Sequence, residues 1–231
     1  MKKKIIVIGL GNFGGNLAKA LTQDGHEVFG IDKNPSRVDM IQQKIPHAIG
    51  LDTSDEASLN HMPLDDTDIV VVAIGENVGA SITTTALIKK NFNGRIIARS
   101  LTPVHKTVLE AMQIDEIIEP EGEYAHELAN RLMVKGAVKS MDLHGEFEIV
   151  EVKIPSKIVG MTLGELDIKK KYQAHIVTVI KQVERKNYLG SAYLDRNVHG
   201  VLHSVYQFES NDLLLVFGKK KDIDKFIDEN A

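Results

Sequence analysis

The stretch KIIVIGLGNFG, residues 4–14, decides the fold of this chain. It opens with a β-branched run typical of a buried strand and continues with three glycines. In such a strand–loop–helix unit, Gly9 permits a tight turn, Gly11 lets the backbone approach a pyrophosphate, and Gly14 allows the helix to pack closely on the strand. Phosphates would meet free N–H groups at the positive end of the helix. The stretch therefore predicts a nucleotide-binding loop, with Asn12 and Phe13 inside it.

The first 120 or so residues alternate β-branched runs with amphipathic segments, which is typical of a parallel α/β sheet. We expect six strands joined by right-handed helical crossovers, a doubly wound Rossmann-type parallel sheet. The expected strands are 4–8, 27–31, 47–49, 69–74, 95–98 and 116–118, and the expected helices are 13–24, 35–43, 55–60, 78–91 and 103–112.

A second pattern follows. Apolar residues at helical spacing predict a long helix over 121–136, and beyond Gly136 the sequence changes character. We expect strands at 147–154, 175–183 and 212–217 and helices at 162–172 and 222–228. The predicted domains are therefore 1–136, the nucleotide-binding domain with its last helix, and 137–231, a smaller α+β domain close to the lower size limit for an independent core.

The composition excludes several classes of protein. The chain has 231 residues, of which 43% are hydrophobic and 26% charged, as in ordinary soluble domains. A net charge of −4 argues against a protein that coats nucleic acid, and the lack of cysteine excludes disulfides and thiolate chemistry. No stretch reaches the roughly 18 apolar residues that span a bilayer, and no signal-peptide cleavage pattern follows the first strand. We expect a cytoplasmic protein.

Acidic and amide side chains follow the expected strands at the edge where ligands bind in such sheets. Asp32 ends the second strand, where its carboxylate can accept hydrogen bonds from ribose hydroxyls and would repel a 2′-phosphate. Lys33 and Arg37 lie near enough to keep NADP as an alternative. Further candidates to contact base, ribose or phosphate follow the third and fourth strands, namely Asp52, Gly75, Glu76 and Asn77.

Other chemistries find less support in the sequence. A dehydrogenase needs a proton-transfer group at the nicotinamide, and the second domain contains no recognisable pair of titratable residues, although an NAD-dependent oxidoreductase with a small accessory domain stays the alternative. His199 and His203 share a spacing that suits zinc on a helix, but Gly200 between them disfavours a helix. No GxSxG motif supports a hydrolase. The lysine runs 169–171 and 219–221 are interpreted as solvated faces.

Several longer segments resemble the RCK (KTN) family, the TrkA and KtrA regulatory subunits of bacterial potassium uptake systems. They are GLGNFGG at 9–15, VAIGENVGAS at 72–81, IARS at 97–100 and IIEPE at 117–121. Residues 157–166 and 211–218 are similar to the C-terminal RCK-C subdomain of that family, so the chain is expected to combine an RCK-N and an RCK-C domain.

The resemblance implies a non-enzymatic, cytosolic homo-oligomeric ring, usually an octamer, docked on a membrane potassium channel or transporter of the TrkH or KtrB type. An adenine nucleotide, either ATP/ADP or NAD(H), would bias the shape of the ring. By the same resemblance Asp32 holds the ribose and Asp52 lies near the adenine. The phosphate side is lined by Ala73, Ile74 and Gly75, with Arg99 as a phosphate-facing cation and Glu121 as a carboxylate that helps hold Mg²⁺ or another cation.

Two departures from the family pattern bear on these expectations. KtrA-like members commonly carry arginine where this chain has Asn12, so we expect ATP and ADP to be less sharply distinguished here. The stretch 183–207 is longer and more polar than the segment that usually links these RCK-C strands in the family. Some family RCK-C dimers bind cyclic di-AMP, which makes the segment Lys169 to Tyr172 and His175 a candidate second site.

Exposed sheet edges predict that the chain assembles with further copies of itself, because unpaired edges need to be covered. The sixth strand and the helix over 121–136 lie at the sheet edge, and the small second domain needs more buried surface than its length provides. We expect symmetric dimer contacts from this helix and from the RCK-C block, with the segment near Gly136 as a hinge.

Overall fold

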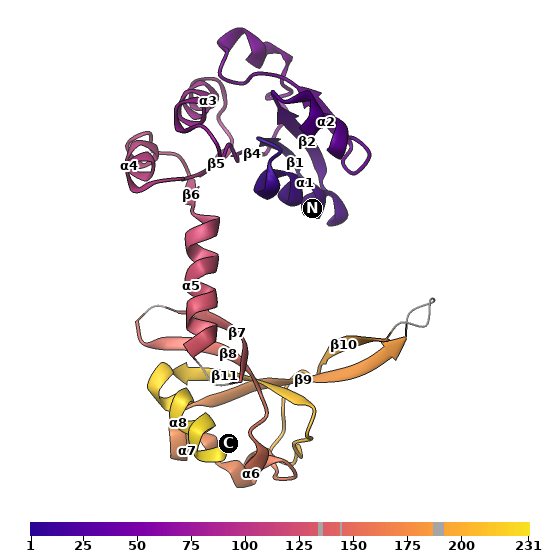
Figure 1. Cartoon of the computed structure of the whole chain (residues 1–231), viewed down its shortest axis with the longest axis vertical. Coiled ribbons are helices and arrows are strands. Elements are labelled where there is room, and N and C mark those ends of the chain that lie inside the picture. The colour runs from indigo at the N-terminus through magenta and orange to yellow at the C-terminus, as the bar shows by residue number, and fades with distance from the viewer. Residues whose placement is uncertain (134–135, 144, 187–191) are drawn as a thin grey trace. The chain divides into compact units, whose positions relative to one another are not determined.

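The computed structural model describes residues 1–133, 136–143, 145–186 and 192–231, and it divides into two compact units, Met1–Pro120 and Glu121–Ala231 (Figure 1). The division precedes helix α5 (Pro120–Met133), whereas the sequence pattern placed the boundary after this helix, at 136. Contacts of α5 explain the difference. The Glu127 carbonyl accepts from Ser140 Oγ at 3.4 Å, and His126 Nε2 lies 2.7 Å from Asp142 Oδ2. Both partners belong to the first strand after the helix.

The first unit contains a six-stranded parallel sheet in the order β3-β2-β1-β4-β5-β6, which confirms the doubly wound fold. The chain enters at the centre, moves to one edge, returns, and then builds the other edge. The strands are β1 (Lys4–Ile8), β2 (Glu27–Asp32), β3 (His47–Gly50), β4 (Ile69–Val72), β5 (Arg95–Arg99) and β6 (Glu116–Ile118).

Helices cover both faces of this sheet, which is why its central strands are apolar on both sides. On β1, Ile5 and Val7 pack in a core with α1 and α2, whereas Ile6 and Ile8 pack in a second core with α3 and α4. Ordinary crossover helices therefore alternate with the strands. They are α1 (Asn12–Gln23), α2 (Pro35–Ile41), the short 3₁₀ helix η1 (Glu56–His61), α3 (Val78–Asn91) and α4 (Pro103–Ala111).

The second unit contains a five-stranded antiparallel sheet in the order β10-β9-β11-β8-β7. Three of its strands match the expected ones. The other two, β7 and β10, were not expected because they lie at the edges, where few side chains are buried, so their sequences lack apolar alternation. The strands are β7 (Ala137–Asp142), β8 (Phe147–Lys153), β9 (His175–Lys186), β10 (Ala192–Val198) and β11 (Asp212–Lys219).

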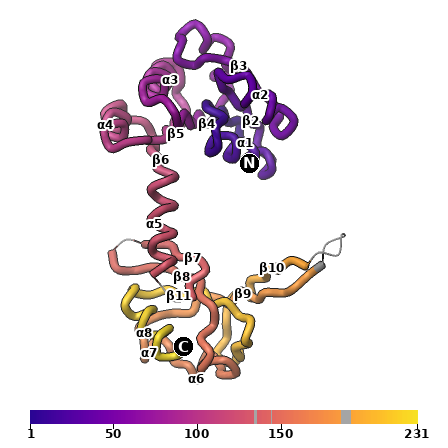
Figure 2. The backbone as a smooth tube through the Cα atoms, in the orientation of Figure 1, coloured from indigo at the N-terminus to yellow at the C-terminus, as the bar shows by residue number. Residues whose placement is uncertain are grey.

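Short helices cover the inner face of this second sheet around Phe208 and Phe226, both fully buried. The single helix expected over 162–172 is two helices, because Asp167 adopts a left-handed conformation (φ 44°) between them. The helices are η2 (Ser156–Ile158), α6 (Leu163–Leu166), α7 (Ile168–Tyr172) and α8 (Lys220–Asn230). Figure 2 shows that the chain completes the six-stranded sheet before it begins the five-stranded one, so the two units are not interleaved.

Candidate nucleotide-binding site

The glycine loop between β1 and α1 has three glycines in three different environments. Gly9 has φ +94°, and a Cβ there would lie 2.9 Å from the Ile74 nitrogen. A Cβ at Gly14 would overlap the Gly9 carbonyl oxygen, so this glycine is needed for close packing of α1. At Gly11 the nearest atom to a Cβ would be Arg37 Nη1, 3.9 Å away. The first and third glycines therefore serve the fold, while the second leaves an open approach to the backbone.

Helix α1 begins at the open side of this loop. Its N-cap is Gly11, which has no side chain to accept from the first backbone N–H groups, and its first turn contains no acidic residue. Asn12 is exposed and uncharged. The positive end of the helix dipole and the first N–H groups are thus left without a side-chain cap, a setting that favours an anion.

Asp32 connects the loop to the end of β2. Its Oδ2 accepts a hydrogen bond from the Leu10 nitrogen at 2.7 Å, and its Oδ1 accepts from the Asn34 nitrogen at 2.8 Å. The residue is only 6% exposed. The parallel pairing of β1 and β2, with Ile8 opposite Ile31, brings this carboxylate beside the loop. Asp32 therefore shapes the glycine loop, and its role as an acceptor for ribose hydroxyls stays a prediction.

An ion pair that the sequence did not suggest lies beside Asp32. Arg37 of α2 places Nη2 2.5 Å from Glu76 Oε1 and Nη1 3.6 Å from Asp32 Oδ2. Glu76 follows β4, so the guanidinium connects two loops at the carboxyl edge of the sheet. The hydrogen bond with Glu76 is the main cause that raises the pKa of Arg37, and the charges of both carboxylates add to it.

Arg99 lies at the end of β5, on the other side of the loop. Its guanidinium carbon is 5.8 Å from the centre of the Phe13 ring, and a side chain at Gly75 would overlap the guanidinium. Ala73 is buried beside Gly9 at the end of β4, and Ile74 follows it. The structure thus brings the residues expected on the phosphate side together around the first turn of α1.

Asp52 and Asn77 have local partners. Asp52 Oδ1 accepts from Ser54 Oγ at 2.6 Å and from the Ser54 nitrogen at 3.0 Å, which lowers the pKa of Asp52, with a smaller contribution from the charge of Lys33. Asn77 caps α3, since its Oδ1 accepts from the Ala80 nitrogen at 2.9 Å. Asn77 therefore has a structural role in starting the helix.

The remaining candidates lie in the second unit. Glu121 is exposed in the first turn of α5, and its part in holding a cation stays a prediction. The segment Lys169 to Tyr172 forms most of α7, His175 begins β9, and cyclic di-AMP binding there likewise stays a prediction. Within the described residues, no group of three or more histidine or acidic side chains could hold a metal ion. His199 and His203 lie outside any helix, which removes the zinc interpretation.

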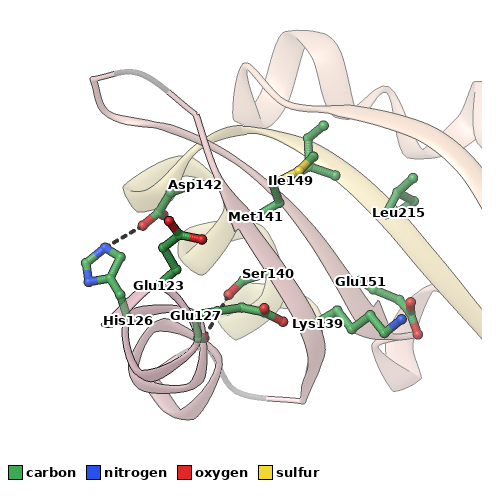
Figure 3. Close-up of a pocket in the computed structure, with 10 residues that line it drawn as sticks. All are labelled: Glu123, His126, Glu127, Lys139, Ser140, Met141, Asp142, Ile149, Glu151 and Leu215. Carbon is green, nitrogen blue, oxygen red and sulfur yellow. Dashed lines mark hydrogen bonds and ion pairs between the residues drawn. The ribbon is translucent and has the colours of Figure 1, made fainter. Parts of the chain in front are cut away.

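Two cavities in the second unit were not anticipated. One, of about 710 Å³, lies between α5 and the outer face of the sheet, with Met141, Ile149 and Leu215 on its floor (Figure 3). The other, of about 920 Å³, is lined by residues of α5, β8 and α8. Neither is lined by Lys169 to Tyr172 or by His175, so neither coincides with the candidate second site.

Comparison with known proteins places the chain in a family. Residues 5–120 match the TrkA-N domain, half of the chain. The Ktr system potassium uptake protein C of Bacillus subtilis (strain 168) is 33% identical over 98% of this chain and 96% of its own length. The chain belongs to the TrkA-N family. Ktr system potassium uptake protein A of the same organism is 30% identical over 98% of this chain and 96% of its own length.

Solved structures agree with this membership at the level of the fold. The RCK domain of GsuK superposes with a TM-score of 0.62 at 16% identity, over 100% of this chain and 49% of that one. The GsuK channel bound to NAD superposes with a TM-score of 0.60 at 15% identity, over 98% of this chain and 39% of that one. Within the described part of this TrkA-N family chain, no helix combines the length and apolar character needed to cross a membrane.

Proposed function

We propose that this chain is a cytoplasmic regulatory subunit of a potassium uptake system that senses an adenine nucleotide. Near full-length similarity to two Ktr system proteins supports the assignment to potassium uptake. The nucleotide assignment is supported chiefly by the open backbone at Gly11, which leads to the uncapped start of α1. That arrangement suits a phosphate group and has no evident structural purpose of its own.

The proposed ligand is ATP, ADP or NAD(H). Its phosphates would lie on the first turn of α1, within the residues gathered around Gly11, Phe13 and Arg99. Its ribose would reach Asp32, whose oxygens each already accept one backbone hydrogen bond and retain lone pairs for hydroxyl donors. On the family resemblance alone, Glu121 is proposed to help hold Mg²⁺ or another hard cation, for which a carboxylate is a suitable ligand.

The site is better suited to binding a ligand than to catalysing a reaction. The acidic groups at the strand ends are engaged: Asp32 by backbone N–H groups, Asp52 by Ser54, and Glu76 by Arg37. A general acid or base needs a proton-transfer path to a substrate, and carboxylates held in this way favour ligand binding over proton transfer. The proposed protein is therefore a non-enzymatic subunit, and the oxidoreductase alternative finds no added support.

Regulation requires a ligand that favours one conformation over another. We propose that the chain forms a homo-oligomeric ring whose shape depends on the bound nucleotide, and that this ring binds a membrane potassium channel or transporter subunit of the TrkH or KtrB type. A coupling free energy of about 1–3 kcal/mol is typical of such effects. Peripheral association with the membrane would follow from that partner.

The test compares the wild type with Gly11→Asp. Because a Cβ at this position meets no atom closer than 3.9 Å, the fold should accept the substitution. Aspartate is also a favourable N-cap, so α1 should keep its stability, while the new carboxylate repels a phosphate. We expect mass spectrometry of gently purified wild-type protein to find a bound adenine nucleotide, and calorimetry to show that the variant loses binding without loss of thermal stability.

Two results would contradict the proposal. A wild-type protein that binds no adenine nucleotide, or a Gly11→Asp variant that binds as well as the wild type, would remove the phosphate site from the glycine loop. Turnover of NADH with a small-molecule substrate by the purified chain would favour the oxidoreductase alternative.

A further inference from the structure

We propose that Arg37 binds the 5′-phosphate groups of the nucleotide and that it exchanges its ion pair with Glu76 for them. This inference rests on the proposed nucleotide function and names the residue that senses the charge of the ligand. The positive charge at the glycine loop would then come from a side chain of α2, because the loop itself contains none.

The first observation is the position of the guanidinium. The open side of Gly11 faces Arg37 Nη1, the nearest atom at 3.9 Å from where a Cβ would be. A phosphate that approaches the backbone at Gly11 therefore comes within reach of Arg37. The loop contributes no positive side chain of its own, since Asn12 is neutral. Arginine also matches a phosphate by donating two parallel hydrogen bonds.

The second observation is the unequal burial of the present ion pair. The Arg37 side chain is 27% exposed, whereas that of Glu76 is 75% exposed. An ion pair with so exposed a partner is screened by water and contributes little to stability. A nucleotide diphosphate has more charge than a carboxylate, and it is also attracted by the start of α1. Exchange of Glu76 for phosphate is therefore favourable, and Glu76 acts as a competing anion in the empty site.

The third observation selects the 5′-phosphates over a 2′-phosphate. Asp32 Oδ2 lies 3.6 Å from Arg37 Nη1, and Asp32 is the residue proposed to accept from the ribose hydroxyls. A 2′-phosphate would have to approach this buried carboxylate, which would repel it and has no N–H or O–H group to donate. The 5′-phosphates would instead lie over Gly11. Arg37 should therefore strengthen binding of ADP and NADH without creating a preference for NADPH.

Calorimetric titrations of the full chain with adenosine, ADP, NADH and NADPH test the exchange. We expect Arg37→Gln to weaken ADP binding about tenfold and to leave adenosine within about twofold, because only the phosphates lose a partner. Glu76→Gln should strengthen ADP binding about threefold, because it removes the competing anion. The matched control is Arg95→Gln, which breaks another exposed Arg–Glu pair, with Glu116, at the opposite end of the strands and should change nothing.

The outcomes separate this inference from the function on which it rests. If the wild type binds none of the four ligands, the proposed function is wrong. If the wild type binds ADP but Arg37→Gln leaves that affinity unchanged, or weakens adenosine equally, Arg37 does not bind the phosphates. If Glu76→Gln weakens ADP binding, there is no exchange. A wild-type preference for NADPH that disappears in Arg37→Gln would assign the guanidinium to the 2′-phosphate and overturn the 5′ assignment.

Discussion

Replacing Asp32 should affect the stability of the empty protein as well as nucleotide binding. Asp32→Ala removes the acceptor of two backbone hydrogen bonds, from Leu10 at 2.7 Å and from Asn34 at 2.8 Å. Each hydrogen bond to a charged acceptor contributes about 1.5–3 kcal/mol. Because Asp32 is only 6% exposed, water can reach the two N–H groups only in part, so it would replace only part of the lost hydrogen-bond free energy. We expect the free energy of unfolding to fall by about 2–4 kcal/mol, a large share of the about 5–15 kcal/mol of a typical domain.

Urea unfolding with and without nucleotide separates the two effects. The control is Asp39→Ala, an exposed position on α2, the helix that follows Asp32, where we expect a change within about 0.5 kcal/mol. Nucleotide affinity, measured by calorimetry at a temperature where the variant is fully folded, should fall by a further factor equivalent to about 1.5–3 kcal/mol because the ribose loses its acceptor. Unchanged stability would refute the role of Asp32 in shaping the loop, and unchanged affinity for ATP, ADP and NADH would place the ribose elsewhere.

Three further predictions concern the fold, a buried carboxyl group and the assembly. Gly14→Ala should destabilise the chain by more than about 3 kcal/mol in urea unfolding, because its Cβ would overlap the Gly9 carbonyl oxygen; near-neutral stability would mean that α1 can shift away. Burial raises the pKa of Glu148 above its usual 4.5, so the folded chain retains this proton to higher pH than the unfolded chain and loses stability as pH rises through that interval. Glu148→Gln should therefore stabilise the protein more at about pH 8 than at about pH 5, and equal effects at both would contradict this. Light scattering should report a dimer or larger, whereas a 25.6 kDa monomer with and without nucleotide would exclude the ring.

The first unit could be predicted from the sequence because its signals are local. Most strands of the parallel sheet are short runs rich in β-branched residues, and two helices begin at their own capping side chains, Asn34 and Asn77. The glycine spacing also predicted the two positions, Gly9 and Gly14, where a Cβ has no room. The expected strand over 69–74 ends early, at Val72, because Ala73 and Ile74 already belong to the turn that packs against Gly9.

The second unit was less predictable because its two edge strands lack a clear alternation of apolar residues. β7 reads as polar and is a strand because it pairs with β8, and β10 is a strand because it pairs with β9. Asp167 ends a helix that the apolar spacing would have continued. The Arg37–Glu76 pair joins residues 39 apart in the chain, and no local pattern marks it, although both residues were individually among the candidates for the site.

The ion pairs of Arg37 bear on whether nucleotide binding could change the conformation of the protein. In the empty site Arg37 lies between two carboxylates, those of Asp32 and Glu76, so the three ionised groups form one connected series with an excess of negative charge. A nucleotide anion that approaches Gly11 adds negative charge to this series, and we expect the exposed Arg37–Glu76 pair to be the one that changes. A ligand shifts a conformational equilibrium only by as much as its interactions differ between the two states. If phosphates replace Glu76 at Arg37 as proposed, the pair between α2 and the loop after β4 provides such a difference, because it is present only in the empty site.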